Sequence, residues 1–437
     1  MKQIVKLGVV CLARKSFDFA AAEDMYCGVI KKLRLDTDIE WHIIESAAYE
    51  VEDAVKAGHA FAAAQVDGIV IINGTFHLGH LVLEIKKRAN KPMLLWAFPE
   101  MPYDGGKIRL NSICGINLNA SNLIKSGYSD FTYTVGMEID NDWVDAIRMI
   151  RALHDSRIGI IGYRAHGFFN VGVSELALYE KFGILIDHYE LAELWDIKED
   201  DDVTAEYREK LLAKFDTSEC NKDQVDKVVR MSAKLRKFME HHGLSAVAIR
   251  CWHEFGEGYG ISPCASMSLV QADGYIVACE GDIDCTITMI CHQAIGAETP
   301  YMADLSQVDF KEDTALMWHC GVAPCNLADD ACKCTLDTYM AFGRGASAGF
   351  VMRSGDVSIA RLDSINGNYR LLLESGKALP MEKVLAGTYA KVRFDTPIEE
   401  LLDKIVYSGA AHHVSMVYGD YIKAFEIFAR FKKLEVI

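Results

Sequence analysis

Three short apolar runs of the chain each end in a side chain that can ligate a metal ion or move a proton. These side chains are Glu280, Asp304 and His319. A glutamate, an aspartate and a histidine that converge from strand ends would form a hard, oxygen-rich site with open positions. Such a ligand set suits Mn²⁺ or Mg²⁺ better than a structural zinc ion, which prefers thiolates.

Glu280 has the most informative position of the three. It follows a predicted strand and precedes Asp282, which could cap a helix predicted over Ile283–Ala294. This strand-to-helix turn would lie at the carboxyl edge of a parallel sheet, where open α/β sheets bind ligands. The alternative is a solvated loop glutamate beside a residue that only caps the helix. Two competing carboxylates, Asp284 and Asp309, are predicted to lie at the surface of a helix and a loop.

A histidine pair, His412-His413, opens a strand predicted over Val414–Tyr418. Successive side chains of an extended strand point to opposite faces, so only one of the two histidines is expected to face a site. The pair taken alone does not decide between metal binding and another role.

Thirteen cysteines, an odd number, are scattered through apolar stretches, which favours a reducing cytoplasm over export. Four of them, Cys320, Cys325, Cys332 and Cys334, lie close together, but their spacing is not typical of zinc or iron–sulfur sites. We expect buried or loop thiols there. A thiolate-metal oxidoreductase is the alternative that these four cysteines would support.

The charge balance limits the class of partner. The chain has 437 residues, with 46 lysines and arginines against 62 aspartates and glutamates, so its formal net charge is −16. Nucleic acids and anionic membranes attract cations, and neither is expected to be the main partner. No apolar run approaches the ~20 residues that a membrane helix needs. We therefore expect a soluble, cytoplasmic protein that acts on a small molecule.

Alternating strand and helix patterns must position these residues. Gly68–Asn73 is a continuous apolar run of the kind buried on both faces of a parallel sheet, and the pattern restarts at Arg157–Tyr163. Residues after Gly296 form short β-rich runs, with a hairpin turn at Asn366-Gly367. The predicted fold is α/β. Two doubly wound, Rossmann-like domains at residues 1–152 and 153–296 precede a mainly antiparallel, barrel-like domain at residues 297–437.

From about residue 245 to the end, the motifs resemble those of the L-fucose/L-arabinose isomerase family. The matching motifs are Cys251-Trp252, Pro263-Cys264, Ala278-Cys279-Glu280-Gly281-Asp282, Ala303-Asp304, His319-Cys320-Gly321 and the closing segment from His412 to Asp420. The N-terminal third resembles the family's first domain in its βα pattern. In that family a Mn²⁺ ion is held by a glutamate, an aspartate and a C-terminal histidine. The matching positions here are Glu280, Asp304 and His413.

This resemblance implies an isomerase that interconverts an aldose and its ketose through a metal-stabilised enediolate. Mn²⁺ is the implied ion, with Mg²⁺ and Co²⁺ as alternatives. Glu280 and Asp304 would serve as base and acid as well as ligands. His319 would replace a ligand histidine or lie behind Asp304. The family's two α/β domains and C-terminal β-barrel agree with the division proposed above.

The substrate is less closely defined by the resemblance. The arabinose isomerase branch has an additional glutamate that is lacking in Ala265–Leu269, so the fucose-type arrangement fits better. Relatives of this length also suit modified hexoses such as sulfoquinovose, whose sulfonate would need a cationic clamp. The arginines available near loops are Arg14, Arg250, Arg344 and Arg353.

Members of the family assemble as trimers or hexamers in which loops of the first domain cover a neighbour's active site. By that resemblance we expect a homotrimer or homohexamer, with Arg14 and His77 contacting the sugar of the neighbouring subunit. The alternative is that both residues close their own sheet. Trp252, Arg250 and His319 complete the expected substrate-binding set. A catalytically inactive sugar-binding protein on the same fold is the rival function.

Overall fold

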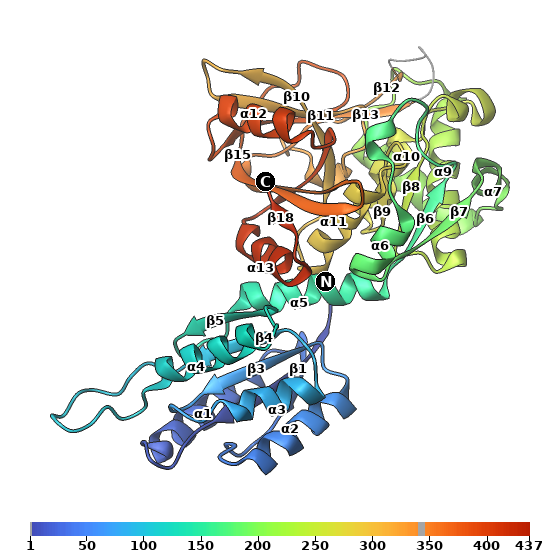
Figure 1. The fold of residues 1–437 in the computed structure, drawn as a ribbon. Coiled ribbons are helices and arrows are strands. Elements are labelled where there is room, and N and C mark those ends of the chain that lie inside the picture. Colours follow the sequence, from blue (N-terminus) through green and yellow to red (C-terminus); the bar gives the residue numbers. More distant parts are fainter. Residues whose placement is uncertain (1, 340–345) are drawn as a thin grey trace. The chain divides into compact units, whose positions relative to one another are not determined.

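The computed structural model describes residues 2–339 and 346–437, which divide into two compact units. The N-terminal unit comprises residues 2–151 and 423–434, and the larger unit comprises residues 152–422 and 435–437 (Figure 1). None of the helices in these described ranges combines the length and the apolar character needed to cross a membrane.

A five-stranded parallel sheet with the order β2-β1-β3-β4-β5 forms the centre of the N-terminal unit. Its strands are β1 (Val5–Leu12), β2 (Ile39–Ile43), β3 (Gly68–Asn73), β4 (Met93–Ala97) and β5 (Phe131–Val135). The helices are α1 (Phe19–Leu33), α2 (Val51–Ala64), α3 (His80–Arg88), α4 (Ser112–Lys125), α5 (Asn141–Asp155) and, from the end of the chain, α13 (Ile422–Lys432).

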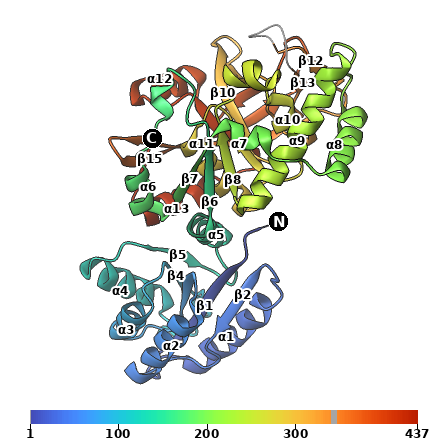
Figure 2. The ribbon, with the colours of Figure 1, turned by 90° about the vertical axis from the view of Figure 1, so that its right-hand side faces the viewer.

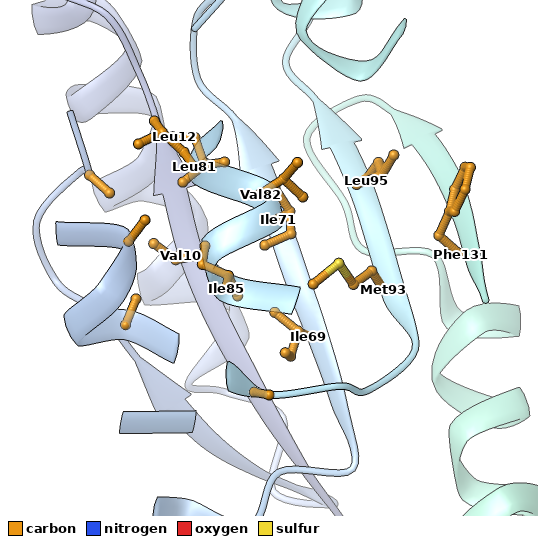
Figure 3. Packing of buried hydrophobic residues seen from close by; sticks show 14 of the residues in the cluster. Val10, Leu12, Ile69, Ile71, Leu81, Val82, Ile85, Met93, Leu95 and Phe131 are labelled. Atoms are coloured by element: carbon orange, nitrogen blue, oxygen red, sulfur yellow. The ribbon is translucent and has the colours of Figure 1, made fainter. Parts of the chain in front are cut away.

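Apolar side chains cover both faces of this sheet. On one face Val10, Ile69, Ile71 and Leu95 pack against helices α2 and α3, with no exposed surface (Figure 3). On the other face a Cβ at Gly68 would meet the ring of α5 residue Trp143 at 2.9 Å, so the helix and the strand are in close contact. A strand buried on both faces needs a continuous apolar run, and β3 has one.

A second parallel sheet, with the order β7-β6-β8-β9, begins the larger unit. Its strands are β6 (Arg157–Ile161), β7 (Leu185–Tyr189), β8 (Ala246–Ile249) and β9 (Ile276–Ala278). The α-helices of this region are α6 (Glu175–Phe182), α7 (Leu191–Asp196), α8 (Asp201–Lys214), α9 (Lys222–His242), α10 (Cys264–Ala272) and α11 (Ile283–Ala294). Two parallel sheets with Rossmann-like βα units confirm the predicted α/β character.

The rest of the larger unit is a nine-stranded sheet with the order β12-β13-β16-β11-β10-β17-β14-β15-β18. Its strands are β10 (Tyr301–Asp309), β11 (Thr314–His319), β12 (Thr335–Asp337), β13 (Ser347–Val351), β14 (Gly355–Ile365), β15 (Asn368–Leu379), β16 (Thr388–Phe394), β17 (His413–Tyr418) and β18 (Glu435–Val436), with helix α12 (Ile398–Ser408). The pairs β13–β16 and β15–β18 are parallel, so the sheet is mixed. Strand β15 also pairs with β16, and the pairing therefore returns on itself through six strands.

Helix α11 connects the two sheets of the larger unit, as its position beside strands of both sheets shows (Figure 2). The Thr288 hydroxyl oxygen accepts a 2.9 Å hydrogen bond from the Leu362 amide of β14. The Nδ1 atom of His292 lies 2.8 Å from the Ser415 hydroxyl of β17. Nearly all of α11 is buried, and polar side chains of such a helix need partners, which Thr288 and His292 find in β14 and β17.

Several sequence predictions match these elements closely. Helix α11 has the predicted bounds, and Gly243 ends α9 in the left-handed conformation expected of a helix C-terminus. Asn366 and Gly367, both with positive φ, join β14 to β15 as the predicted two-residue turn. The division of the larger unit at residue 296 stays a prediction.

Candidate active site

Glu280 lies on the turn between β9 and α11, with its backbone in the left-handed region (φ 61°). At the next residue, Gly281, an added Cβ would lie 2.5 Å from the carbonyl oxygen of Tyr163. Only glycine tolerates such a close approach, so the loop that follows β6 packs directly on this turn. Holding a residue other than glycine at positive φ costs free energy, and residues in this conformation cluster at functional sites.

Asp282 caps α11, as the sequence predicted, and also holds two cationic groups. Its Oδ1 atom accepts a 3.0 Å hydrogen bond from the Cys285 amide. Its Oδ2 atom lies 2.8 Å from His413 Nδ1 and accepts a 2.5 Å bond from Arg361 Nη1. All of these side chains are buried. Because Asp282 fixes the Nδ1 side of the ring, the Nε2 atom of His413 faces the opposite way.

Three neighbouring antiparallel strands, β11, β10 and β17, bring the other candidate ligands together. Asp304 of β10 lies directly opposite His413 of β17, and on its other side it pairs with Trp318, next to His319. The rings of His319 and His413 stack with centroids 5.5 Å apart. Residues opposite each other on paired strands have adjacent side chains. Sheet register therefore accounts for the contact between Asp304 and His413.

The ligand atoms of these residues converge. His413 Nε2 lies 3.4 Å from Glu280 Oε2 and 3.7 Å from Asp304 Oδ1. The ligand atoms of Asp304, His319 and His413 all lie within 4.8 Å of one another, and those of Glu280, His412 and His413 form a second such group. Two ligands at right angles on one Mn²⁺ or Mg²⁺ ion would lie about 3 Å apart, so the spacing suits a shared ion.

Hydrogen bonding within the described residues leaves three of these atoms without a partner. They are His413 Nε2, Asp304 Oδ1 and His319 Nε2, all buried. An unpaired polar atom in a protein interior costs free energy, and buried atoms of this kind call for a partner. A divalent cation bound among them would satisfy all three. The donor set, with two carboxylates and imidazole nitrogens, therefore fits a hard metal ion.

The protonation equilibria of the cluster are strongly coupled. Burial raises the pKa of Glu280, but the hydrogen bond from His412 and the nearby His413 imidazole outweigh burial and lower that pKa to about 2. Burial lowers the pKa of His413, while its contacts with Asp282 and Glu280 raise it to about 10. Glu280 is therefore ionised at neutral pH, and a metal ion bound at His413 Nε2 takes the place of a proton.

His412 departs from the sequence expectation. Strand alternation was expected to keep one histidine of the pair out of the site, and this was wrong. Strand β17 begins at His413, so His412 precedes the extended segment and is free of the alternation. Its Nε2 atom lies 3.4 Å from Glu280 Oε2, the same distance as that of His413.

The loop between β6 and α6 contributes Phe168 and Asn170 to the surroundings of the cluster, and the sequence analysis did not predict either residue. Phe168 stacks on His412 at 5.5 Å between ring centroids and meets Trp252 edge-on at 6.1 Å. Asn170 Nδ2 lies 3.1 Å from His412 Nδ1, and the Ala165 amide donates to the Glu280 carbonyl oxygen. The rule that placed Glu280 after a strand of the same sheet would have selected this loop too. Trp252, predicted to bind substrate, is thereby placed beside the cluster.

Two of the predicted substrate-binding residues belong to the N-terminal unit. Arg14 has an exposed side chain, and its amide donates to the Thr75 hydroxyl. His77 is fully buried, with Nδ1 2.9 Å from the Thr75 carbonyl oxygen and Nε2 close to the Asn119 side chain. The proposed contact of these residues with a neighbour's sugar stays a prediction.

The arginines considered for a sulfonate clamp have varied surroundings. Arg250 pairs with Glu254, its Nε atom 3.3 Å from the carboxylate. Arg353 forms a two-point ion pair with Glu298. Arg344 lies outside the described residues. The structure therefore adds no support for any of these three as a sulfonate ligand.

Two carboxylates lie in environments other than those predicted. Asp284 was expected at the surface of its helix, but it is 3% exposed, because α11 is surrounded by both sheets. Asp304 was expected at a strand end. Strand β10 instead continues to Asp309 through its pairing with β11, so Asp304 lies within the strand. Asp309 is exposed, as expected.

The cysteines that gather in space differ from those that gather in the sequence. Cys320 contacts Cys264 with 3.7 Å between sulfurs, and Cys279 contacts Cys251 at 3.1 Å. Burial, followed by the charges of all four of these thiols, raises the pKa of Tyr339. Among the described residues, Cys325, Cys332 and Cys334 form no cluster with metal-ligand geometry. Sequence separation therefore hid the cluster that the fold creates.

Comparison with known proteins adds independent information. Residues 8–155 match a family model described as the N-terminal domain of fucose/sulfoquinovose isomerase. A sulfoquinovose isomerase of Priestia aryabhattai is 27% identical over 429 residues, which cover 94% of each chain. A sulfoquinovose isomerase of Alkalicoccus urumqiensis is 25% identical, and the aligned region covers 85% of this chain and 86% of that relative. A periplasmic solute-binding protein from Actinobacillus succinogenes 130z, 14% identical over 66% of this chain and 91% of that one, matches with a TM-score of 0.19, too low to indicate a shared fold.

These matches define the class of protein as an isomerase, an intramolecular oxidoreductase. Within that class, the matches support a fucose isomerase-like family. The family resemblance that the motifs from residue 245 onward indicated is thereby confirmed, and the match extends it to the N-terminal third.

Proposed function

We propose that the chain is a metal-dependent aldose–ketose isomerase whose substrate is sulfoquinovose. The observation that carries this proposal is the convergence of three buried, unpartnered ligand atoms beside the ionised Glu280 carboxylate. The curated relatives, all described as sulfoquinovose isomerases, support the substrate.

Glu280, Asp304 and His413 would hold the ion, with His319 as a further ligand. Mn²⁺ is the ion we propose, and Mg²⁺ and Co²⁺ suit the same donors. When bound, a divalent cation supplies Lewis-acid polarisation of the sugar carbonyl and stabilises negative charge on the neighbouring oxygens. Asp282 and Arg361 keep the His413 ring oriented toward the carboxylates.

The reaction moves a proton between C1 and C2 of the open-chain sugar. Glu280 is ionised at neutral pH and therefore has the form required of the base that removes the C2 proton. Delivery of a proton to C1 of the resulting enediolate yields the ketose. Asp304, whose Oδ1 atom lies 3.7 Å from His413 Nε2, is the group that would serve that step. Phe168, which stacks on His412 and contacts Trp252, would limit the access of water on that side of the cluster.

The experiment is a substrate screen with a matched variant. Purified protein loaded with Mn²⁺ would be incubated with sulfoquinovose, L-fucose, D-arabinose and L-arabinose, and ketose formation followed by NMR. We expect turnover of sulfoquinovose, abolished in Glu280→Gln and retained in Glu399→Gln, an exposed helix position. Conversion of none of the sugars, with Mn²⁺ still bound, would favour an inactive sugar-binding protein instead.

We also propose a homotrimer or homohexamer in which Arg14 and His77 complete a neighbour's site. Mixing an Arg14 variant with a Glu280 variant tests the shared site, since partial rescue requires residues from different chains. A fully active monomer in sedimentation would contradict the shared site.

For the third domain we propose a barrel-like sheet. The ring of pairings through β16, β11, β10, β17, β14 and β15 supports this description.

A further inference from the structure

The loop between β6 and α6, residues 162–174, contacts the candidate active site at two places. Near its start, the Ala165 amide donates a 3.1 Å hydrogen bond to the Glu280 carbonyl oxygen. Farther along, Asn170 Nδ2 lies 3.1 Å from His412 Nδ1. Open α/β sheets bind ligands at the carboxyl ends of their parallel strands, and this loop follows the carboxyl end of β6. The loop is therefore positioned to contact a molecule bound at the cluster.

Arg164 is the arginine of this loop, and contacts hold both its backbone and its side chain. An added Cβ at Gly281 would lie 2.6 Å from Arg164 Cα, so the backbone of Arg164 packs on the residue that follows Glu280. The side chain extends along the loop, and its Nη1 atom donates a 2.8 Å hydrogen bond to the Tyr163 hydroxyl. The guanidinium Cζ atom lies 4.9 Å from the centre of the Tyr163 ring and 5.4 Å from that of Phe169. Aromatic faces attract a cation, and these contacts restrict the rotamers of the long side chain before any ligand binds.

The charge of Arg164 is not neutralised by a carboxylate. Among the arginines that the structure describes in the larger unit, only Arg164 and Arg393 form no ion pair with an aspartate or glutamate. Arg393 lies on β16, which contributes none of the candidate metal ligands, and donates to the Glu312 carbonyl oxygen. A guanidinium group stays protonated in proteins and has five N–H donors. Arg164 therefore has a full positive charge and unused donors in a loop that contacts the cluster.

The backbone of Tyr163 gives a second observation. Tyr163 has a φ of 65°, a conformation that is unfavourable for a bulky residue, and Glu280 has a φ of 61°. The Tyr163 carbonyl oxygen would lie 2.5 Å from an added Cβ at Gly281, so the two strained segments are in contact. Strain of this kind persists only where the surrounding structure holds it, and it clusters at ligand sites. The same packing thus holds both the proposed base and the residue that accepts a hydrogen bond from Arg164.

The sulfonate of sulfoquinovose is a group that such an arginine suits. A guanidinium fork can donate two parallel hydrogen bonds to two oxygens of one anion. The Tyr163 hydroxyl accepts a bond from Arg164 and still has its own proton to donate. In an extended six-carbon sugar the sulfonate lies about 7 Å from C1 and C2, which is about the length of an arginine side chain. A side chain that starts beside the Glu280 turn therefore has the reach to meet the sulfonate while C1 and C2 lie at the cluster.

We propose that Arg164, supported by the Tyr163 hydroxyl, binds the sulfonate of the substrate and gives the site its preference for a sulfonated sugar. This inference rests on the proposed function and names the residue that recognises the end of the sugar remote from the metal ion. L-fucose lacks the anion and gains nothing from Arg164. The arginine takes no part in proton transfer, so its contribution falls on substrate binding and not on the conversion of the bound sugar.

Steady-state kinetics of the Mn²⁺-loaded enzyme with sulfoquinovose test the proposal. In Arg164→Gln the KM should rise about 10- to 100-fold, the range expected when hydrogen bonds to a charged group are lost, while kcat stays within about twofold. Arg164→Lys should recover part of the loss, because lysine keeps the charge but lacks the fork. The control is Arg157→Gln, which removes an exposed arginine at the opposite end of β6 and should match the parent protein. Bound Mn²⁺ should be equal in every variant.

A binding measurement separates this inference from the proposed function. The open-chain alcohol obtained by reducing sulfoquinovose keeps the sulfonate but has no carbonyl group to isomerise. In calorimetric titrations the Mn²⁺-loaded parent protein should bind this alcohol at least about tenfold more tightly than D-glucitol, which has a hydroxyl in place of the sulfonate. Arg164→Gln should lose this preference, and Arg157→Gln should keep it.

The outcomes distinguish the two claims. An unchanged KM and an unchanged preference in Arg164→Gln would overturn the inference, and so would an equal loss in Arg157→Gln or the absence of any preference in the parent protein. A parent protein that isomerises no sugar, but whose preference for the sulfonated alcohol disappears in Arg164→Gln, would contradict the proposed function and support the role of Arg164.

Discussion

Each unit contains a cluster of buried polar residues, and the two clusters differ in how far their hydrogen-bonding capacity is satisfied. In the N-terminal unit the amide of Asn119 donates to Asn73, and His77 has a partner at each ring nitrogen. In the larger unit His413 Nε2, Asp304 Oδ1 and His319 Nε2 have none. Burial is equally complete for His77 and His413. The comparison shows that unmet bonding capacity, more than burial, distinguishes the candidate metal site from a hydrogen-bond network in which His77 has a partner at both ring nitrogens.

The two clusters also respond differently to protons. Burial lowers the pKa of His77, which therefore stays neutral inside its network. In the larger unit, carboxylates raise the pKa of His413 to about 10 in spite of burial. The first cluster is complete without a charge, whereas the second holds a positive charge among carboxylates, where a metal ion can replace the proton.

The largest effect is expected from Glu280→Gln, which removes the proposed base and one metal ligand while leaving the shape of the side chain. Turnover of sulfoquinovose should fall by about 10³-fold or more, the range that a positioned proton-transfer group contributes. Bound Mn²⁺ should decrease in the same preparation, as measured by elemental analysis. Glu399→Gln on the exposed face of α12 is the matched control. Wild-type turnover in Glu280→Gln would contradict the assignment.

A smaller effect is expected when the support of the site is weakened but its ligands are kept. In Asp282→Asn the amide oxygen can still cap α11, but the charge that holds His413 and Arg361 is lost. Mn²⁺ affinity should weaken by about 10- to 100-fold, as is usual for residues that orient metal ligands.

The control for this variant is Asp200→Asn, which changes an exposed cap at the start of α8. Calorimetric titration with Mn²⁺ measures both variants. An equal loss of affinity in the two would show that general destabilisation, and not the contact with His413, is responsible.

His77→Gln sharpens the comparison from the N-terminal unit. Loss of the ring leaves Asn119 and the Thr75 carbonyl oxygen short of a partner, which should lower the free energy of unfolding by about 1–3 kcal/mol. Bound Mn²⁺ should not change. Urea denaturation and elemental analysis give the two readouts, with the exposed His154→Gln as control. Loss of bound metal in His77→Gln would remove the distinction between the clusters.

A further effect is spread over a range of pH. Burial raises the pKa of Asp284 from its ordinary value to about 8. The folded protein therefore binds a proton that the unfolded chain releases near pH 4, so stability from this group is present at low pH and is lost as pH rises toward 8. The slope contributed is at most ~1.4 kcal/mol per pH unit.

Asp284→Asn should remove this slope and make the protein more stable at neutral pH. Thermal unfolding of both proteins between pH 5 and 8, stripped of metal, measures the difference. Parallel stability curves for parent and variant would show that Asp284 is ionised in the folded state.

Much of the scaffold was accessible from the sequence because hydrophobic runs and caps are local signals. The bounds of β1, β3, α2 and α11 follow from apolar periodicity, and the role of Asp282 as a cap follows from its place before a helix. Glu280 was found through the strand-end rule. Asp304 and His413 were assigned through the family resemblance, and the structure places their side chains together.

What the sequence left open depends on register between distant strands. Arg361 has no local signal, and only the placement of β14 beside α11 and β17 brings it to Asp282. The burial of Asp284 likewise follows from packing on all sides of α11. His412 was misjudged because the first residue of a strand cannot be fixed to one position from composition alone. The contacts of Cys251 with Cys279 and of Cys264 with Cys320 are hidden for the same reason, since separate elements contribute these cysteines.

The chain path through the two units has a consequence for synthesis on the ribosome. Helix α13, at residues 422–432, packs within the N-terminal unit, where Lys423 pairs with Asp140 and Asp142 and Arg430 lies over the Phe131 ring. The packing of residues 2–151 is therefore complete only after residues 152–422 have been synthesised and α13 has followed them. A nascent chain that has reached only the larger unit lacks α13, whose buried side chains include Phe425 and Phe428.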